Sequence, residues 1–152
     1  MTRRELAEEN FTSGYNCAQS VALAFADIVN IDNSELCALS SAFGGGMGRL
    51  REVCGAVSGM FMIAGLLYGC DSLEATAAKG ELYARIQQLA KSFESENGSI
   101  VCRELLGTGS GHSSPTPESR TPEYYKKRPC RELVGCAAEI LESYIRDNPP
   151  VR

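Results

Sequence analysis

The chain has 152 residues, and an apolar content of 43% is enough to build the core of one domain. Its 15 basic and 19 acidic residues give a net charge of −4. Nucleic-acid-binding proteins usually carry a basic face, so this charge argues against nucleic acid as a partner. It argues equally against attraction to an anionic membrane surface.

Two helices are expected before residue 30. Thr2 and Glu5 have the spacing of a capping box and predict a short helix that fades near Asn10. Asn16 is a candidate N-cap for a second helix, because the apolar residues that follow it recur at helical spacing as far as Val29.

The middle of the chain contains a helix signal, a glycine-rich run and an uncharged segment. Ser34 can cap a helix that reaches about Phe43. The run 44–48 (GGGMG) lacks the lysine of a phosphate-binding P-loop. It predicts a tight connection where the backbone passes close to another group, with the functional site as one candidate.

Segment 53–70 has 18 residues and no charge, which is the length of a transmembrane candidate. Its several glycines and the amphipathic helices around it favour a buried helix instead, from about Glu52 to Leu67. We therefore expect no membrane partner.

The second half of the chain predicts three further helices. One runs from residue 71 or 72 to 97, a short one covers 101–107, and the last begins at Pro129 and ends before 148–150. An irregular loop rich in Gly, Ser, Thr and Pro is expected at 107–122. No segment alternates as a strand would. The expected fold is all-α: a compact single-domain bundle, residues 1–152, of about five to seven helices around the central uncharged helix.

Seven cysteines are a high and odd number, and no two of them form a Cys-x-x-Cys motif. No export signal is recognisable after Arg3-Arg4, so we expect a cytoplasmic protein. In that reducing compartment a cysteine-rich sequence indicates metal binding or catalysis more than disulfides. Cys37, Cys70 and Cys136 are interpreted as small buried apolar residues.

The other four cysteines fall within the first turn of a predicted helix. Free backbone N–H groups and the positive end of the helix dipole stabilise negative charge there, so they favour the thiolate form. Thiolate is the form that attacks disulfides and binds metals. These four candidate ligands of one redox or metal site are Cys17, Cys54, Cys102 and Cys130.

Two of these four cysteines have the same local setting. The sequence CRELLG at 102–107 recurs as CRELVG at 130–135, with five of six positions identical. The segments between the two copies do not match, so the repetition is local and does not indicate a solenoid.

Gly55 and Gly59 follow Cys54 directly and lie four residues apart, on one face of the uncharged helix. One interpretation is a tight helix crossing, within the chain or across a homodimer. The other is space for a cluster or cofactor beside Cys54, which makes both glycines candidate cofactor-binding residues.

The motifs YNCAQS at 15–20, CGAVSG at 54–59 and CREL at 102–105, followed by Cys130, resemble the C_GCAxxG_C_C family of small redox-active proteins. The resemblance spans about residues 16–141. It implies that Cys17, Cys54, Cys102 and Cys130 are the functional set and that they hold an iron–sulfur cluster. A similar module forms part of split-Soret cytochromes, but this chain lacks the haem-attachment pattern Cys-x-x-Cys-His, so no haem is expected.

Three functions stay open from the sequence. The first is electron transfer or redox sensing by an iron–sulfur cluster on the four cysteines. The second is metal-free thiol–disulfide chemistry, and the third a structural zinc or partner-binding module. A redox partner protein is expected, without a sign of its identity. Catalytic motifs of hydrolases and dehydrogenases are absent, and the sequence does not decide whether the protein is an enzyme.

Overall fold

The computed structural model of the chain describes residues 1–73, 76–107 and 112–151. Helices form its regular elements, and within those ranges no strand is present, only an isolated antiparallel bridge between Val53 and Val101. The expected all-α class is therefore confirmed.

The first two helices begin where the sequence predicts. In α1 (Arg3–Thr12) and α2 (Cys17–Leu23) the residues Thr2 and Asn16 are the N-caps, and each completes a capping box with a side chain three residues later. The expected continuation of α2 to Val29 is wrong. The chain leaves the helix after Leu23, turns at the fully buried Phe25, and forms the short 3-10 helix η1 (Ala26–Ile28).

The next elements are short. Helix α3 (Asn33–Ser40) is capped by Asp32, whose carboxylate accepts from the Ser34 N–H, so the expected cap Ser34 is wrong by two positions. A 3-10 turn, η2 (Ser41–Phe43), leads into the glycine-rich turn α4 (Gly44–Met47).

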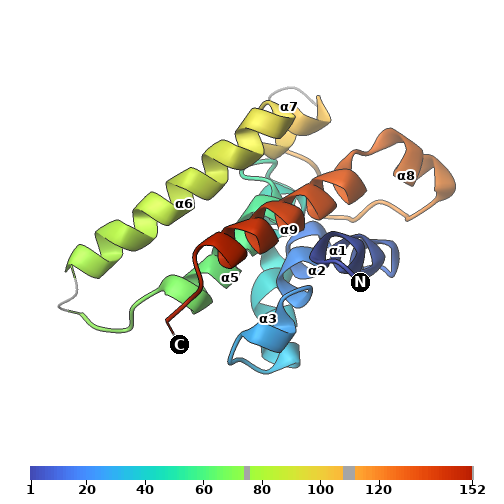
Figure 1. Cartoon of the computed structure of the whole chain (residues 1–152). Helices are drawn as coiled ribbons and strands as arrows, with labels where there is room; N and C mark the ends of the chain where they lie inside the picture. Colours follow the sequence, from blue (N-terminus) through green and yellow to red (C-terminus); the bar gives the residue numbers. More distant parts are fainter. Residues whose placement is uncertain (74–75, 108–111, 152) are drawn as a thin grey trace.

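Helix α5 (Gly55–Tyr68) is the uncharged helix of the sequence, and most of its first ten residues are buried. It packs against α2, α6 (Thr76–Asn97) and α9 (Cys130–Asp147), as Figure 1 shows. The predicted buried central helix is thus confirmed. In the part of the chain that the structure describes, no helix has the length and apolarity needed to cross a membrane.

Two short helices complete the fold: α7 (Cys102–Leu106) lies at the end of α6, and α8 (Pro122–Lys127) precedes α9 (Figure 1). The sequence interpretation missed α8. The expected loop at 107–122 is non-helical at 112–121, and its positions 108–111 lie outside the described residues.

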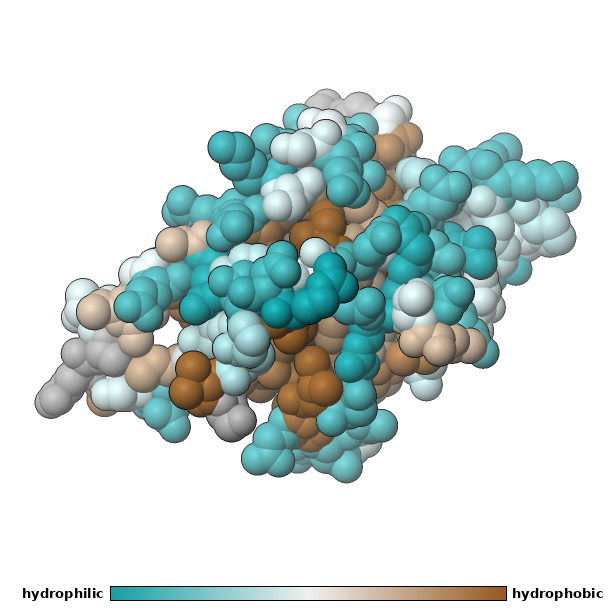
Figure 2. Space-filling model, viewed as in Figure 1, coloured by the Kyte–Doolittle hydropathy of each residue, from teal (hydrophilic) through white to brown (hydrophobic). Residues whose placement is uncertain are grey.

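The core lies where α1, α2, α5 and α9 meet, and the C-terminal half of α6 covers one side of it. Figure 2 shows hydrophilic residues over the outward faces of α6 and α9, with apolar residues seen mainly in the seams between helices. Because α2, α5, α7 and α9 all begin at a cysteine or directly after one, the packing of these helices determines the relative positions of the four thiols.

Candidate functional site

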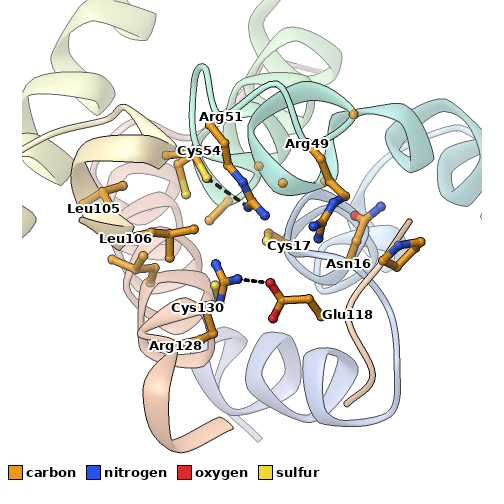
Figure 3. Close-up of a pocket in the computed structure, with 18 of the residues that line it drawn as sticks. Asn16, Cys17, Arg49, Arg51, Cys54, Leu105, Leu106, Glu118, Arg128 and Cys130 are labelled. Carbon is orange, nitrogen blue, oxygen red and sulfur yellow. Dashed lines mark hydrogen bonds and ion pairs between the residues drawn. The ribbon is translucent and has the colours of Figure 1, made fainter. Parts of the chain in front are cut away.

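Four cysteines from four helix starts line one pocket of about 420 Å³. Cys17, Cys102 and Cys130 are the first residues of α2, α7 and α9, and Cys54 is the residue directly before α5. Cys17 is half-buried and the other three are buried. The predicted positions at helix starts are confirmed, and Figure 3 shows Cys17, Cys54 and Cys130 around a common space.

Cys54 and Cys102 are brought together by a short backbone pairing that the sequence did not reveal. The Cys54 N–H donates to the Ile100 carbonyl at 2.8 Å, and the Cys102 N–H donates to the Glu52 carbonyl at 2.6 Å. These two bonds flank the Val53–Val101 bridge. The segments before α5 and α7 are therefore held side by side, and each leads directly into a cysteine.

The glycine-rich turn passes directly behind Cys102. Gly46 has φ of +69°, and a Cβ atom built on it would lie 2.6 Å from the Cys102 Cβ. Such a distance does not occur between real side chains, so no residue with a side chain fits there without movement. The prediction of a close backbone approach in the run 44–48 is confirmed, and the neighbour is the cysteine site itself.

Gly55 and Gly59 face α2 of the same chain. An added Cβ atom would lie 3.0 Å from the Cys17 Cβ at Gly55, where the Phe43 carbonyl oxygen is 2.8 Å away as well, and 2.6 Å from the Ala18 carbonyl oxygen at Gly59. The helix-crossing interpretation is therefore confirmed within the chain, and the two glycines no longer support the expected homodimer, which stays a prediction. Gly55 also lines the pocket, and its role in cofactor binding stays a prediction too.

Cys17 has an environment that favours its thiolate. A side-chain hydrogen bond with Cys130 is the largest cause that lowers the pKa of Cys17, to about 6, against the opposing effect of burial. The backbone N–H groups of Gly45 and of Cys17 itself and the positive charge of Arg120 act in the same direction. The expected help from backbone groups at a helix start is thus observed at this cysteine.

The other three thiols are held in the neutral form. The hydrogen bond to Cys17 and burial raise the pKa of Cys130, and burial raises the pKa values of Cys54 and Cys102. At Cys54 the N–H groups of Ala56 and Val57, in the first turn of α5, oppose that effect but do not overcome it. A helix start therefore lowers a thiol pKa only where burial and neighbouring thiols do not outweigh it.

Four arginines line the same pocket. The Arg51 side chain is buried and donates from Nε to the Ser113 hydroxyl at 2.8 Å and from Nη1 to the Cys102 sulfur at 3.6 Å. Arg128, part of a basic run, pairs with Glu118. The other two are Arg49 and Arg120. In the sequence, Arg49 follows the glycine run 44–48 directly and Arg51 lies two residues later.

The three remaining cysteines do not line the pocket. Cys136 is buried as expected; its thiol donates to the Glu96 carboxylate at 2.8 Å, and burial raises its pKa to about 11. Cys37 is only half-buried, beside Gln19. Cys70 is exposed, so the expectation of burial is wrong there, because it lies beyond the end of α5 in a non-helical connection.

This arrangement can stabilise negative charge on sulfur from two directions, by backbone N–H groups and by guanidinium groups. The model of a protein family described as "Putative redox-active protein (C_GCAxxG_C_C)" matches residues 15–144 of the chain. No curated protein and no solved structure is similar enough to the chain to count as a match.

Proposed function

Because the chain belongs to the C_GCAxxG_C_C family of redox-active proteins, we propose that its four pocket cysteines bind one iron–sulfur cluster for electron transfer or redox sensing. The observation that carries the proposal is that Cys17, Cys54, Cys102 and Cys130 line a single pocket. Four cysteine thiolates are the usual ligand set of such clusters.

The donor set suits a cluster, because four cysteines line one pocket of about 420 Å³. Iron and sulfide atoms would occupy the space between the four thiolates. The structural zinc of the third sequence hypothesis can also take four thiolates, so metal analysis of the purified protein separates the two.

The surrounding groups suit an anionic centre. A bound cluster would supply one-electron chemistry at this position. Arg51, beside the Cys102 sulfur, and the N–H groups at the starts of α2 and α5 stabilise the added negative charge of the reduced state. Because Cys54, Cys102 and Cys130 are neutral without metal, iron binding must release protons from them.

Anaerobic purification followed by absorption spectroscopy and assays of iron and acid-labile sulfide tests the proposal. We expect charge-transfer absorption in the visible range and loss of most iron in each of the variants Cys17→Ala, Cys54→Ala, Cys102→Ala and Cys130→Ala. Cys37→Ala is the matched control, because Cys37 is half-buried but outside the pocket. A protein that stays colourless and free of iron after anaerobic reconstitution would show that the proposal is wrong.

A second candidate function rests on the hydrogen bond between the Cys17 and Cys130 side chains. In thiol–disulfide exchange, the Cys17 thiolate attacks the disulfide of a substrate and releases one substrate thiolate. The Cys130 sulfur, after losing its proton, then attacks Cys17 and releases the second thiolate. The protein ends with a Cys17–Cys130 disulfide, and the substrate disulfide is reduced by two electrons.

This second function is tested on metal-free protein treated with glutathione disulfide. Peptide mapping should find a reversible disulfide that joins Cys17 to Cys130 and is absent from Cys130→Ala. Mixed disulfides spread over all exposed thiols, with none between these two residues, would contradict it.

A further inference from the structure

The pocket has more positive charge than its acidic groups balance. Of the described residues that line it, four are arginines and Glu118 is the one carboxylate. Glu118 is engaged by Arg128. Four guanidinium groups against one carboxylate leave an excess of three positive charges among the lining residues other than cysteine, in a chain whose net charge is −4.

Arg51 carries this charge farthest into the molecule, since only 4% of its surface is exposed. Among the described residues, its guanidinium donates to the Ser113 hydroxyl and to the Cys102 sulfur and forms no ion pair with a carboxylate. A guanidinium without a carboxylate partner is unfavourable at a buried position. An anion in the pocket would supply a counterion.

Arg49, two residues before Arg51, points into the same pocket (Figure 3). Its Nε donates to the Ser114 carbonyl at 2.6 Å, and the Ser113 N–H donates to the Arg49 carbonyl at 3.0 Å. These bonds hold the arginine in place against segment 112–121. The Arg49 Cγ and the Arg51 Nη1 lie 2.9 Å and 3.6 Å from the same point, the Cβ position of Gly45. The fork of a guanidinium group matches the oxygen spacing of a carboxylate or phosphate group.

The opposite side of the pocket is apolar. Leu105 and Leu106 of α7 lie across from Arg49 in Figure 3, and Pro115 and Pro117 also line the space. A cavity of about 420 Å³ with an apolar wall and a few converging polar groups has the character of a small-molecule site.

We propose that the pocket binds a small organic anion, with Arg49 and Arg51 holding its carboxylate or phosphate group and Leu105 and Leu106 contacting its apolar body. Arg51 also contacts the Cys102 sulfur, so the anion would lie beside the cysteines. No cysteine is among the residues proposed to hold it, so the site requires no iron, and it adds a ligand to the redox centre proposed above.

Calorimetric titration of the purified protein, with and without iron, tests this inference. Benzoate and phenyl phosphate are the anionic probes, and benzyl alcohol is the neutral probe of similar size. We expect saturable binding of at least one anion, at least ten times tighter than benzyl alcohol, and weaker at higher salt. The preferred anion distinguishes a carboxylate site from a phosphate site.

Arg49→Met and Arg51→Met should each weaken the binding of that anion about tenfold or more, because each removes a charged hydrogen-bond donor. Arg131→Met is the control, since Arg131 is exposed and does not line the pocket. Circular dichroism checks that each variant folds. If Arg51→Met does not fold, because the buried Arg51 is needed for folding, Arg49→Met still tests the inference.

The inference is wrong if neither anion binds, if benzyl alcohol binds as tightly as the anions, or if Arg49→Met in folded form binds the anion unchanged. Iron content is measured on the same samples. Iron without anion binding would overturn this inference alone, and anion binding without iron would overturn the proposed cluster alone.

Discussion

Gly46 and Cys102 are in such close contact that a Cβ atom on Gly46 would lie 2.6 Å from the Cβ of Cys102. Gly46 also has left-handed backbone angles, in a turn where Met47, Arg49 and Arg51 have positive φ as well. Such angles are rare for residues with side chains, and they recur at functional sites. The turn places the Gly46 backbone directly against Cys102, and it brings Arg49 and Arg51 to the pocket.

Gly46→Ala should therefore disturb both the fold and the site. The new methyl group meets the Cys102 Cβ at 2.6 Å and the backbone nitrogen of Glu52 at 2.8 Å, and neither can move easily. We expect a loss of about 2–4 kcal/mol in the free energy of unfolding, measured by urea denaturation.

Gly107→Ala is the matched control for that experiment. Gly107 has φ of +68°, almost the same as Gly46, but nothing lies within 4 Å of its Cβ position. The strain of a left-handed alanine alone should destabilise the protein by about 1 kcal/mol. If both variants lose the same free energy of unfolding, the contact with Cys102 does not contribute to the effect of Gly46→Ala.

The crossing of α2 and α5 gives a prediction with opposite signs at two glycines of one helix. Gly59→Ala should destabilise the protein by about 1–3 kcal/mol, because its Cβ would lie 2.6 Å from the Ala18 carbonyl oxygen. Gly65→Ala should stabilise it by up to about 1 kcal/mol, because its Cβ meets nothing within 4 Å and alanine is the better helix former. Thermal unfolding of both variants measures the difference, and an unchanged or raised Tm of Gly59→Ala would contradict the crossing geometry.

Local signals in the sequence were enough to predict the helix starts of the site. Asn16 with Gln19 forms a capping box whose first helical residue is Cys17. The burial of α5 also follows from its lack of charge. The missed helix α8 had a local signal as well, because Thr121 caps it and Pro122 occupies its first turn.

The electrostatics of the site could not be predicted in the same way. Arg51 and Cys102 are 51 positions apart, and they meet because of a left-handed turn and a two-bond backbone pairing. Arg120 acts on Cys17 from a segment that sequence reasoning treated only as an irregular loop. Helix-start geometry alone predicted low pKa values at all four cysteines. Burial reverses the effect at Cys54 and Cys102, and the hydrogen bond to Cys17 together with burial reverses it at Cys130.

The reactivity of Cys17 in reduced, metal-free protein should follow a pKa of about 6. Its alkylation by iodoacetamide, followed by peptide mass spectrometry across pH 5–9, should reach half its maximum rate near that pH. Cys130→Ala removes the largest cause of the lowered pKa, so the midpoint should move upward toward the ordinary value of about 8.5. Cys136→Ala, outside the pocket, should leave the midpoint unchanged. A midpoint that does not respond to Cys130→Ala would contradict the proposed thiol pair.

The stability of the same metal-free protein should pass through a maximum near pH 8. Cys17 loses its proton at a pH of about 6 in the folded state but only at about 8.5 in the unfolded chain. Between these values the unfolded chain binds more protons, so the free energy of unfolding rises with pH, and this contribution is lost as the pH falls through 6.

Above pH 8.5 the sign reverses, because the pKa values of Cys54, Cys102 and Cys130 are raised in the folded state. The unfolded chain then releases protons that the folded protein retains, so the free energy of unfolding falls as the pH rises further. Urea denaturation in reductant from pH 5 to 10 measures both limbs. Cys17→Ala should flatten the rising limb. It should also weaken the falling limb without removing it, because Cys17 is the largest cause of the raised pKa of Cys130, whereas burial raises those of Cys54 and Cys102. A rising limb that persists in this variant would assign it to groups other than the Cys17 thiolate.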